Sequence, residues 1–180
     1  MIQFVISDGV STSAASTTVF IMPTNDPAFF NFTDKVLTYN ETTRTPVNLF
    51  SQSDVLIDPD DDGGTLQWIT IEIVAPNIDP SDMLAADALD TGLDINPNAG
   101  SLLNISGEGS FMDYDAVLGT VMYFNNFPGI NISNRTIHVI TFDGMDESFV
   151  HTITINVVSF DDQPMCYFNM LVRLMSIPLI

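Results

Sequence analysis

The segment with the clearest chemical potential is an acidic turn at residues 58–64, which reads Asp-Pro-Asp-Asp-Asp-Gly-Gly. Its carboxylates repel one another, and the proline and the glycines exclude a helix or a central strand. Strand-like sequence flanks it at 55–57 and 66–73, so the carboxylates are expected on one tight turn at the end of a β-structure. Such a turn is either a solvated acidic loop or one wall of a Ca²⁺ site, because Ca²⁺ takes about six to eight oxygen ligands in irregular geometry.

The chain as a whole is strongly acidic. Its 180 residues contain 4 Lys and Arg against 23 Asp and Glu, for a formal net charge of −19. Such a charge argues against nucleic acid or an anionic membrane as the partner and favours cations. Hydrophobic residues make up 46% of the chain, which is enough to fill a core, and no apolar run reaches the ~18 residues of a membrane span. We therefore expect a folded protein with no direct membrane insertion.

Two segments of the chain share one pattern. A strand-like stretch, an Asp-Gly turn, a Thr-rich strand and an acidic linker ending in proline occur first at 3–27 and again at 138–164. The turn aspartates, Asp8 and Asp143, are 135 residues apart, and an internal repeat of this length indicates a tandem array. The predicted boundaries are 1–25 for the last hairpin of a preceding repeat, 26–164 for one complete repeat, and 165–180 for an unassigned apolar tail or a truncated next repeat.

Alternation of apolar and polar residues predicts several short strands within the complete repeat. The predicted strands are 35–39, 46–50, 67–74, 102–106, 120–124, 136–142 and 152–158. About seven strands separated by Gly, Pro, Asn and Asp turns indicate an all-β, Ig-like Greek-key sandwich. One short helix is expected at 111–119, because Ser110 and Asp113 form a capping box. Residues 79–92 are expected to form a loop with one helical turn.

The order of these motifs resembles the extracellular repeats of cadherins. The strand ending in Asp-Gly, the Thr-rich strand and the Asn-Asp-Pro linker look like the closing hairpin and linker of such a repeat. Residues 54–73 are similar to the cadherin stretch in which Asp-x-Asp-x-Gly precedes a strand. Residues 100–118 and 134–144 are similar to the cadherin-like tandem repeats of very large surface and matrix proteins. The resemblance covers nearly all of residues 1–164 and implies a cadherin-like sandwich that binds Ca²⁺.

Topology predicts which acidic turns meet. In a seven-stranded sandwich the loop after the second strand, the loop between the sixth and seventh strands and the entering chain lie at one pole. The residues expected to converge there are Asn25, Asp26, Asp58, Asp60 and Asp143. The resemblance implies that this set binds Ca²⁺ at a first junction between repeats. For Asp143 the alternative is a plain hairpin turn, since Asp-Gly is a common hairpin signal.

At the opposite pole the resemblance implies a second junction. Glu41 matches the family's early Glu ligand, and Asp161 and Asp162 of the second linker would join it. Asp113 and Asp115 lie where the family places an Asp-x-Glu pair, but Asp113 is also expected to cap the helix. Both linkers depart from the family's Asp-x-Asn-Asp-Asn pattern, which leaves the number of ions per junction open.

The sequence also bears on glycosylation and catalysis. Sequons predict N-glycosylation at Asn31, Asn104, Asn131 and Asn134, whereas the sequon at Asn40 conflicts with an inward-turned Glu41. His138 and His151 are interpreted as ordinary sheet residues, and no nucleophile or phosphate-loop motif occurs, so no enzyme activity is expected. Trp68 is expected in the core and not on a sugar-binding surface.

These observations favour a calcium-dependent, cadherin-like module of the extracellular space or cell surface, carried by a membrane-anchored parent protein. Its expected partners are adjacent repeats of the same parent chain and a homophilic or matrix protein partner. Ca²⁺ at the junctions would cancel like charge and lock consecutive sandwiches into a rod. The alternative is a carbohydrate- or protein-binding sandwich of a secreted multidomain protein in which Ca²⁺ is merely structural. A strip of exposed aromatic residues on one face would favour that alternative.

Overall fold

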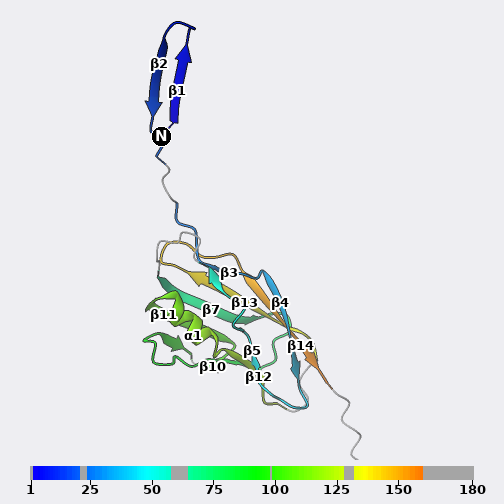
Figure 1. Ribbon diagram of the computed structural model, residues 1–180. Coiled ribbons are helices and arrows are strands. Elements are labelled where there is room, and N and C mark those ends of the chain that lie inside the picture. Colours follow the sequence, from blue (N-terminus) through cyan, green and yellow to red (C-terminus); the bar gives the residue numbers. More distant parts are fainter. Residues whose placement is uncertain (1, 21–23, 58–64, 98, 128–131, 160–180) are drawn as a thin grey trace, which may run out of the picture.

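The computed structural model describes residues 2–20, 24–57, 65–97, 99–127 and 132–159 (Figure 1). They form an all-β fold with one short helix, as predicted. The strands are β1 (Ile2–Ser7), β2 (Thr12–Thr17), β3 (Phe29–Phe30), β4 (Asp34–Asn40), β5 (Val47–Asn48), β6 (Leu56–Ile57), β7 (Leu66–Val74), β8 (Asp82–Ala85), β9 (Asp94–Asn96), β10 (Ala99–Gly100), β11 (Leu102–Gly109), β12 (Met122–Asn125), β13 (Arg135–Phe142) and β14 (His151–Val158), and the helix is α1 (Phe111–Leu118).

Two sheets build the sandwich. The larger sheet has the order β4-β14-β13-β7-β11-β9, and the smaller sheet has the order β10-β8-β12-β5. Strand β4 pairs in parallel with β14, whereas the other neighbours in both sheets are antiparallel. Leu84 and Tyr123 of the smaller sheet share one buried apolar cluster with Ile71 and Ile137 of the larger sheet. The prediction of a β-sandwich is therefore confirmed, and the Greek-key connectivity stays a prediction.

Each of the seven predicted strands is present, with boundaries within a few residues of the expected ones. The helix is also confirmed. It is capped by Ser110, whose hydroxyl accepts from the backbone of Asp113 while the Asp113 carboxylate accepts from the Ser110 backbone. The predicted helical turn within 79–92 is wrong, because this segment contains β8, which lies between β10 and β12 in the smaller sheet. Strand β8 has no β-branched residue, so its sequence gave little indication of a strand.

The expectation that Trp68 lies in the core is wrong. Its neighbours Ile69 and Ile71 are completely buried between the sheets, and successive side chains on a strand point to opposite faces. Trp68 accordingly lies half-buried on the outer face of the larger sheet. There it stacks on Phe142 of β13, with ring centroids 5.1 Å apart.

The hairpin β1–β2 forms a separate two-stranded sheet (Figure 1), and all of its side chains are exposed. Its turn has the same construction as the turn between β13 and β14. Asp8 Oδ1 accepts from the backbone of Val10 and Ser11, at 2.9 and 2.7 Å, just as Asp143 does in its own turn. The internal repeat seen in the sequence is therefore also a structural repeat at this hairpin.

A buried polar network joins the two sheets. Arg135 of β13 and Asp82 of β8 form an ion pair with Nε 2.6 Å from Oδ2, and both side chains are fully buried. The other carboxylate oxygen of Asp82 accepts from the Tyr123 hydroxyl at 2.6 Å and from the Asn125 amide at 3.0 Å. Tyr39 of β4 extends the network by donating to the Asn125 carbonyl at 2.6 Å. The network therefore ties β4 and β13 of one sheet to β8 and β12 of the other.

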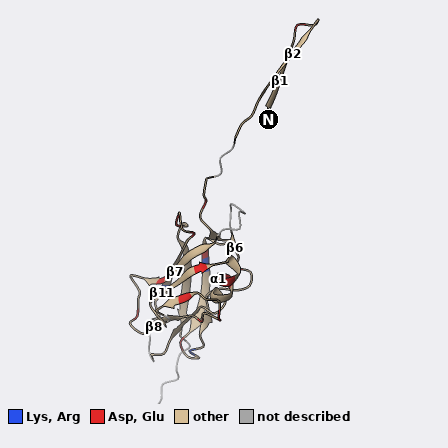
Figure 2. Ribbon diagram, turned by 90° about the vertical axis from the view of Figure 1, so that its left-hand side faces the viewer, with Lys and Arg blue, Asp and Glu red and all other residues tan. Residues whose placement is uncertain are grey.

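Acidic positions are spread over the sandwich, whereas basic positions are few (Figure 2). The described cations are largely committed to internal contacts. Arg135 pairs with Asp82, and Lys35 pairs with Asp54 and also donates to the Leu49 carbonyl at 2.9 Å. The acidic charge of the described surface is therefore left for partners outside the sandwich to compensate.

Candidate metal centre

Asp143 forms the tip of the β13–β14 hairpin. Its Oδ1 accepts from the backbone N–H groups of Met145 and Asp146, at 2.8 and 2.9 Å, and Gly144 beside it has a φ of +107° that favours glycine. Burial raises the pKa of Asp143, but these backbone bonds and the Asn25 amide outweigh burial and bring the pKa below its usual value. Asp143 is therefore a turn residue through Oδ1, while Oδ2 faces the linker.

Asn25 brings the linker to this hairpin. Its Nδ2 donates to Oδ2 of Asp143 at 2.9 Å and to Oδ2 of Asp146 at 3.3 Å. The predicted meeting of the linker with the turn of Asp143 is thus confirmed for Asn25, across 118 residues of sequence. Asp146 was not among the predicted ligands. The corresponding position of the first hairpin is Ser11, so the internal repeat gave no indication of an acid there.

The remaining predicted members of the first junction are placed only in part. Asp26 is exposed beside Asn25 in the linker. Strand β3, which continues the linker, pairs with β6, and Phe29 lies opposite Ile57. Asp58 and Asp60 lie outside the described residues. The pairing of β3 with β6 nevertheless brings the linker beside the last described residue before Asp58.

For the second predicted junction, the structure gives backbone contacts near Glu41. Glu41 follows β4, and its N–H donates to the carbonyl of Val158 at 3.1 Å. The parallel pairing of Asn40 with Val158 leads both strands out at the same pole. Asp161 and Asp162 lie outside the described residues, so their approach to Glu41 stays a prediction.

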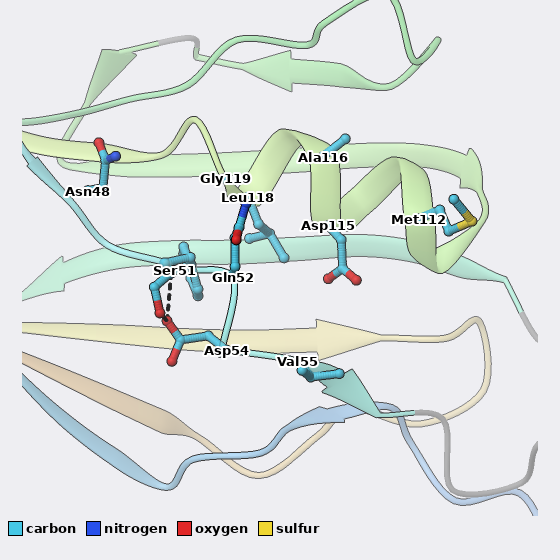
Figure 3. A pocket seen from close by; sticks show the side chains of 11 residues that line it. Asn48, Ser51, Gln52, Asp54, Val55, Met112, Asp115, Ala116, Leu118 and Gly119 are labelled. Atoms are coloured by element: carbon cyan, nitrogen blue, oxygen red, sulfur yellow. Dashed lines mark hydrogen bonds between the residues drawn. The ribbon is translucent and has the colours of Figure 1, made fainter.

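The two acids of α1 have different surroundings. Oδ2 of Asp113 accepts from the Ser110 N–H at 3.0 Å and from the Ser110 hydroxyl at 2.6 Å. Asp113 is thus engaged by the helix N-terminus, as the sequence favoured. Asp115 lies on the next turn and faces a surface pocket (Figure 3). The structure brings no junction residue to either of them among the residues it describes.

The donor set at the first junction suits a hard cation. Carboxylate and amide oxygens are the ligands that Ca²⁺ takes, and Asp143, Asp146 and Asn25 supply both kinds once the Asn25 amide turns its oxygen inward. Within the described ranges, no three His, Cys, Asp or Glu side chains are grouped closely enough to hold a metal. The described residues thus provide part of a coordination shell, which Asp58 and Asp60 would have to complete.

A cluster of aromatic side chains lies beneath the linker. Phe30 is almost fully buried and packs edge-to-face against His151, with centroids 5.3 Å apart. His151 Nε2 accepts from the Phe30 N–H at 3.2 Å, and its Nδ1–H donates to the Phe32 carbonyl. Both ring nitrogens of the neutral imidazole are therefore hydrogen-bonded to the backbone of residues 30–32, which follow the linker. His138 lies on the opposite face of the sheet, so the two histidines form no pair, as the sequence interpretation expected.

The free energy of unfolding is expected to fall as the pH drops from about 7 to 5. Burial lowers the pKa of His151 below its ordinary value of 6.5, with a smaller opposing effect of the Phe32 carbonyl. Below pH 6.5 the unfolded chain therefore takes up a proton that the folded chain refuses, and folding loses stability by up to about 1.4 kcal/mol per pH unit. Urea unfolding at several pH values measures this slope.

The matched variants are His151→Gln and His138→Gln. His151→Gln removes the buried titrating group and should flatten the slope of the free energy of unfolding against pH, whereas His138→Gln removes a half-buried histidine of the outer face and should change the slope less. Equal slopes in wild type and His151→Gln would contradict this explanation. Above pH 5 ordinary carboxylates stay largely ionised, so they contribute little within this window.

The predicted glycosylation positions differ in accessibility. Asn31 and Asn134 are exposed, although the Asn31 amide donates to the Ser53 carbonyl at 2.8 Å. Asn104 is half-buried in the middle of β11, and its Oδ1 is buried without a hydrogen-bond partner among the described residues. Asn131 lies outside the described residues. Access therefore favours Asn31 and Asn134 over Asn104.

The comparisons with known proteins add no relative. The sequence matches no protein-family model, and a search of curated proteins finds no match. No helix in the described part of the chain is both long enough and apolar enough to cross a membrane. The cadherin-like assignment therefore depends on the residues and contacts described above.

Proposed function

We propose that the chain is a calcium-dependent, cadherin-like repeat of an extracellular or cell-surface protein, serving adhesion or matrix architecture. In this proposal Ca²⁺ binds at the junction where the linker meets the β13–β14 hairpin and fixes one sandwich relative to the next. The ion would be held by Asn25, Asp26, Asp143 and Asp146, with Asp58 and Asp60. A second ion at the other pole would use Glu41, Asp161 and Asp162.

The contact of Asn25 with Asp143 and Asp146 carries this proposal. An uncompensated pair of carboxylates at a hairpin tip repels itself, and the linker amide alone offers little charge to offset this repulsion. A divalent cation at the same place would neutralise both carboxylates and tie them to the linker. The strongly acidic composition of the chain has the same explanation, because such a rod would carry its cations at the junctions.

The exposed hairpin β1–β2 supports a tandem arrangement. Counting back from the turn aspartate, Phe4 and Ile6 of β1 correspond to Val139 and Thr141 of β13. The latter two are completely buried in the sandwich, whereas Phe4 and Ile6 are 56% and 73% exposed. An apolar face of this kind requires a second sheet to cover it. We infer that the hairpin belongs to a neighbouring repeat, which makes repeats of the same parent chain its partners.

Ca²⁺ is expected to raise the melting temperature of the chain by several degrees. An ion that binds only the folded state adds RT ln(1 + [L]/Kd), or about 1–3 kcal/mol for sites of ~10⁻⁴ M at millimolar Ca²⁺. Thermal unfolding in about 1 mM Ca²⁺, in 1 mM Mg²⁺ and in EDTA measures this difference. Mg²⁺ is the control, because it prefers a tighter octahedral shell. Identical melting curves in Ca²⁺ and EDTA would remove the main reason for the proposal.

A carbohydrate- or protein-binding module is the second candidate, and the Trp68–Phe142 pair is the feature that bears on it. The pair lies on the outer face of the larger sheet, where a flat ligand could reach it. The two rings stack on each other at an interplanar angle of 21°, so they form one local contact and not a strip along the face. Trp68 is the single tryptophan of the chain, and its fluorescence on addition of glycans would distinguish the two candidates.

A further inference from the structure

A pocket of about 640 Å³ opens beside α1 (Figure 3), and its lining contains none of the proposed metal ligands Asn25, Asp143 and Asp146. The helix forms one wall, and the chain between β5 and β6 forms the other. Phe50 and Leu118 provide a buried apolar floor, with 5% and 2% of their surface exposed. The volume is in the range of ordinary ligand pockets.

Two large apolar side chains are exposed at the rim of the pocket, among polar residues such as Ser51 and Gln52. Met112 on the helix is 82% exposed, and Val55 on the opposite wall is 47% exposed. Exposed large apolar side chains that border a pocket indicate a binding surface more strongly than isolated ones do. Met112 is also flexible and polarisable, which suits contact with an aliphatic chain.

Asp115 is the uncompensated charge of this pocket. It points from the helix into the space facing Val55 (Figure 3), and among the described residues its carboxylate has no hydrogen-bond or ion-pair partner. The other acid of the lining, Asp54, is paired with Lys35 and accepts from Ser51. Asp115 is exposed at the mouth of the pocket, and partial desolvation by its surroundings raises the pKa of its carboxyl.

We propose that this pocket binds the side chain of a lysine or arginine presented by a partner polypeptide. The cationic head would pair with Asp115, and the aliphatic stem would lie along Met112 and Val55 over the floor formed by Phe50 and Leu118. Long basic side chains suit such a site, because they bury their methylene stems while the charged head finds a carboxylate. The net charge of −19 would attract a basic partner from a distance.

The inference is independent of the proposed calcium junction. None of the residues that carry it contacts Asn25, Asp143 or Asp146 in the described structure, and it assigns Asp115 to a partner side chain and not to a metal. Binding should therefore persist in EDTA. The negative electrostatic potential of the whole chain attracts any cation. Binding in this pocket must therefore be distinguished from non-specific attraction to the acidic surface.

The test uses NMR titration of the isotope-labelled chain with the peptide acetyl-Gly-Lys-Gly-amide and with its norleucine counterpart, which has the apolar stem but no charge. The expected result is saturable shifts confined to residues 48–55 and 111–119, with the lysine peptide bound about tenfold or more tightly than the norleucine peptide. Asp115→Asn should weaken binding of the lysine peptide by a similar factor. Met112→Ala, at an exposed position, should weaken it several-fold through the lost apolar contact.

Glu72→Gln is the matched control, since it removes the same charge from an exposed position on the larger sheet. It should leave the dissociation constant within a factor of two, the scatter expected from a small change in net charge. Equal weakening by Glu72→Gln and Asp115→Asn would overturn the proposal in favour of non-specific attraction. Equal binding of both peptides, or no pocket shifts up to about 10 mM peptide, would also overturn it.

Discussion

Replacing Arg135 by methionine is expected to lower the free energy of unfolding by roughly 3–5 kcal/mol, the range for breaking a buried ion pair from one side. The substitution keeps an unbranched apolar chain in the sandwich but leaves Asp82 fully buried without its cation. The Tyr123 hydroxyl, the Asn125 amide and the Asp79 N–H would still donate to Asp82, but three neutral donors do not balance a buried charge. Urea unfolding followed by circular dichroism at pH 7 measures the loss.

Two further variants make this expectation specific. Arg44→Met removes the same charge from an exposed loop and should change stability by less than about 0.5 kcal/mol. The double variant Arg135→Met with Asp82→Leu removes both charges together, and its loss should be clearly smaller than the sum of the single losses. A cost below about 1 kcal/mol for Arg135→Met would show that the ion pair is not what holds the two sheets in register.

Local signals in the sequence predicted most of the framework. The capping box of α1 operates within three residues, from Ser110 to Asp113, and the sequence showed it directly. The long strands β7, β13 and β14 were found because their alternation follows the side-chain period of a strand with one buried face. Topology then predicted one long-range contact, between Asn25 and Asp143, which no local pattern reveals.

The Asp82–Arg135 pair was not predictable in the same way. Its members are 53 residues apart, and Asp82 lies in an acidic segment whose composition is typical of a loop. Only the packing of β8 against β13 makes that carboxylate different from its exposed neighbours. The outward position of Trp68 follows from strand alternation, because Ile69, Ile71 and Ile73 occupy the buried face and Trp68 must point to the opposite one.

The calcium proposal yields an expectation whose size depends on the ion. Asp143→Asn keeps an oxygen for the turn bonds to Met145 and Asp146, but removes the charge that faces Asn25 and Asp146. Without metal the substitution should cost little, because the weaker turn bonds of a neutral amide lose part of the stabilisation that lowers the pKa of Asp143, while relief of repulsion between two neighbouring carboxylates offsets part of this loss. With about 1 mM Ca²⁺ it should cost about 1–3 kcal/mol, the range for losing a hydrogen-bonded charged partner. A solvated hairpin turn cannot produce a loss that grows on addition of Ca²⁺.

Glu147→Gln is the internal control for this substitution. Glu147 lies in the same hairpin and is exposed, and the change removes the same charge one residue beyond Asp146. It relieves part of the same repulsion but removes no proposed ligand. Its effect on stability should therefore be small and nearly the same with and without Ca²⁺.

The measurement that tests the calcium junction most directly is the stability difference between Asp143→Asn and wild type, determined by urea unfolding in EDTA and again in about 1 mM Ca²⁺. The proposal predicts a small loss in EDTA and a clearly larger loss, of about 1–3 kcal/mol, in Ca²⁺, whereas the effect of Glu147→Gln should be the same in the two conditions. The same difference in both conditions for Asp143→Asn would contradict it and leave Asp143 as an ordinary turn residue.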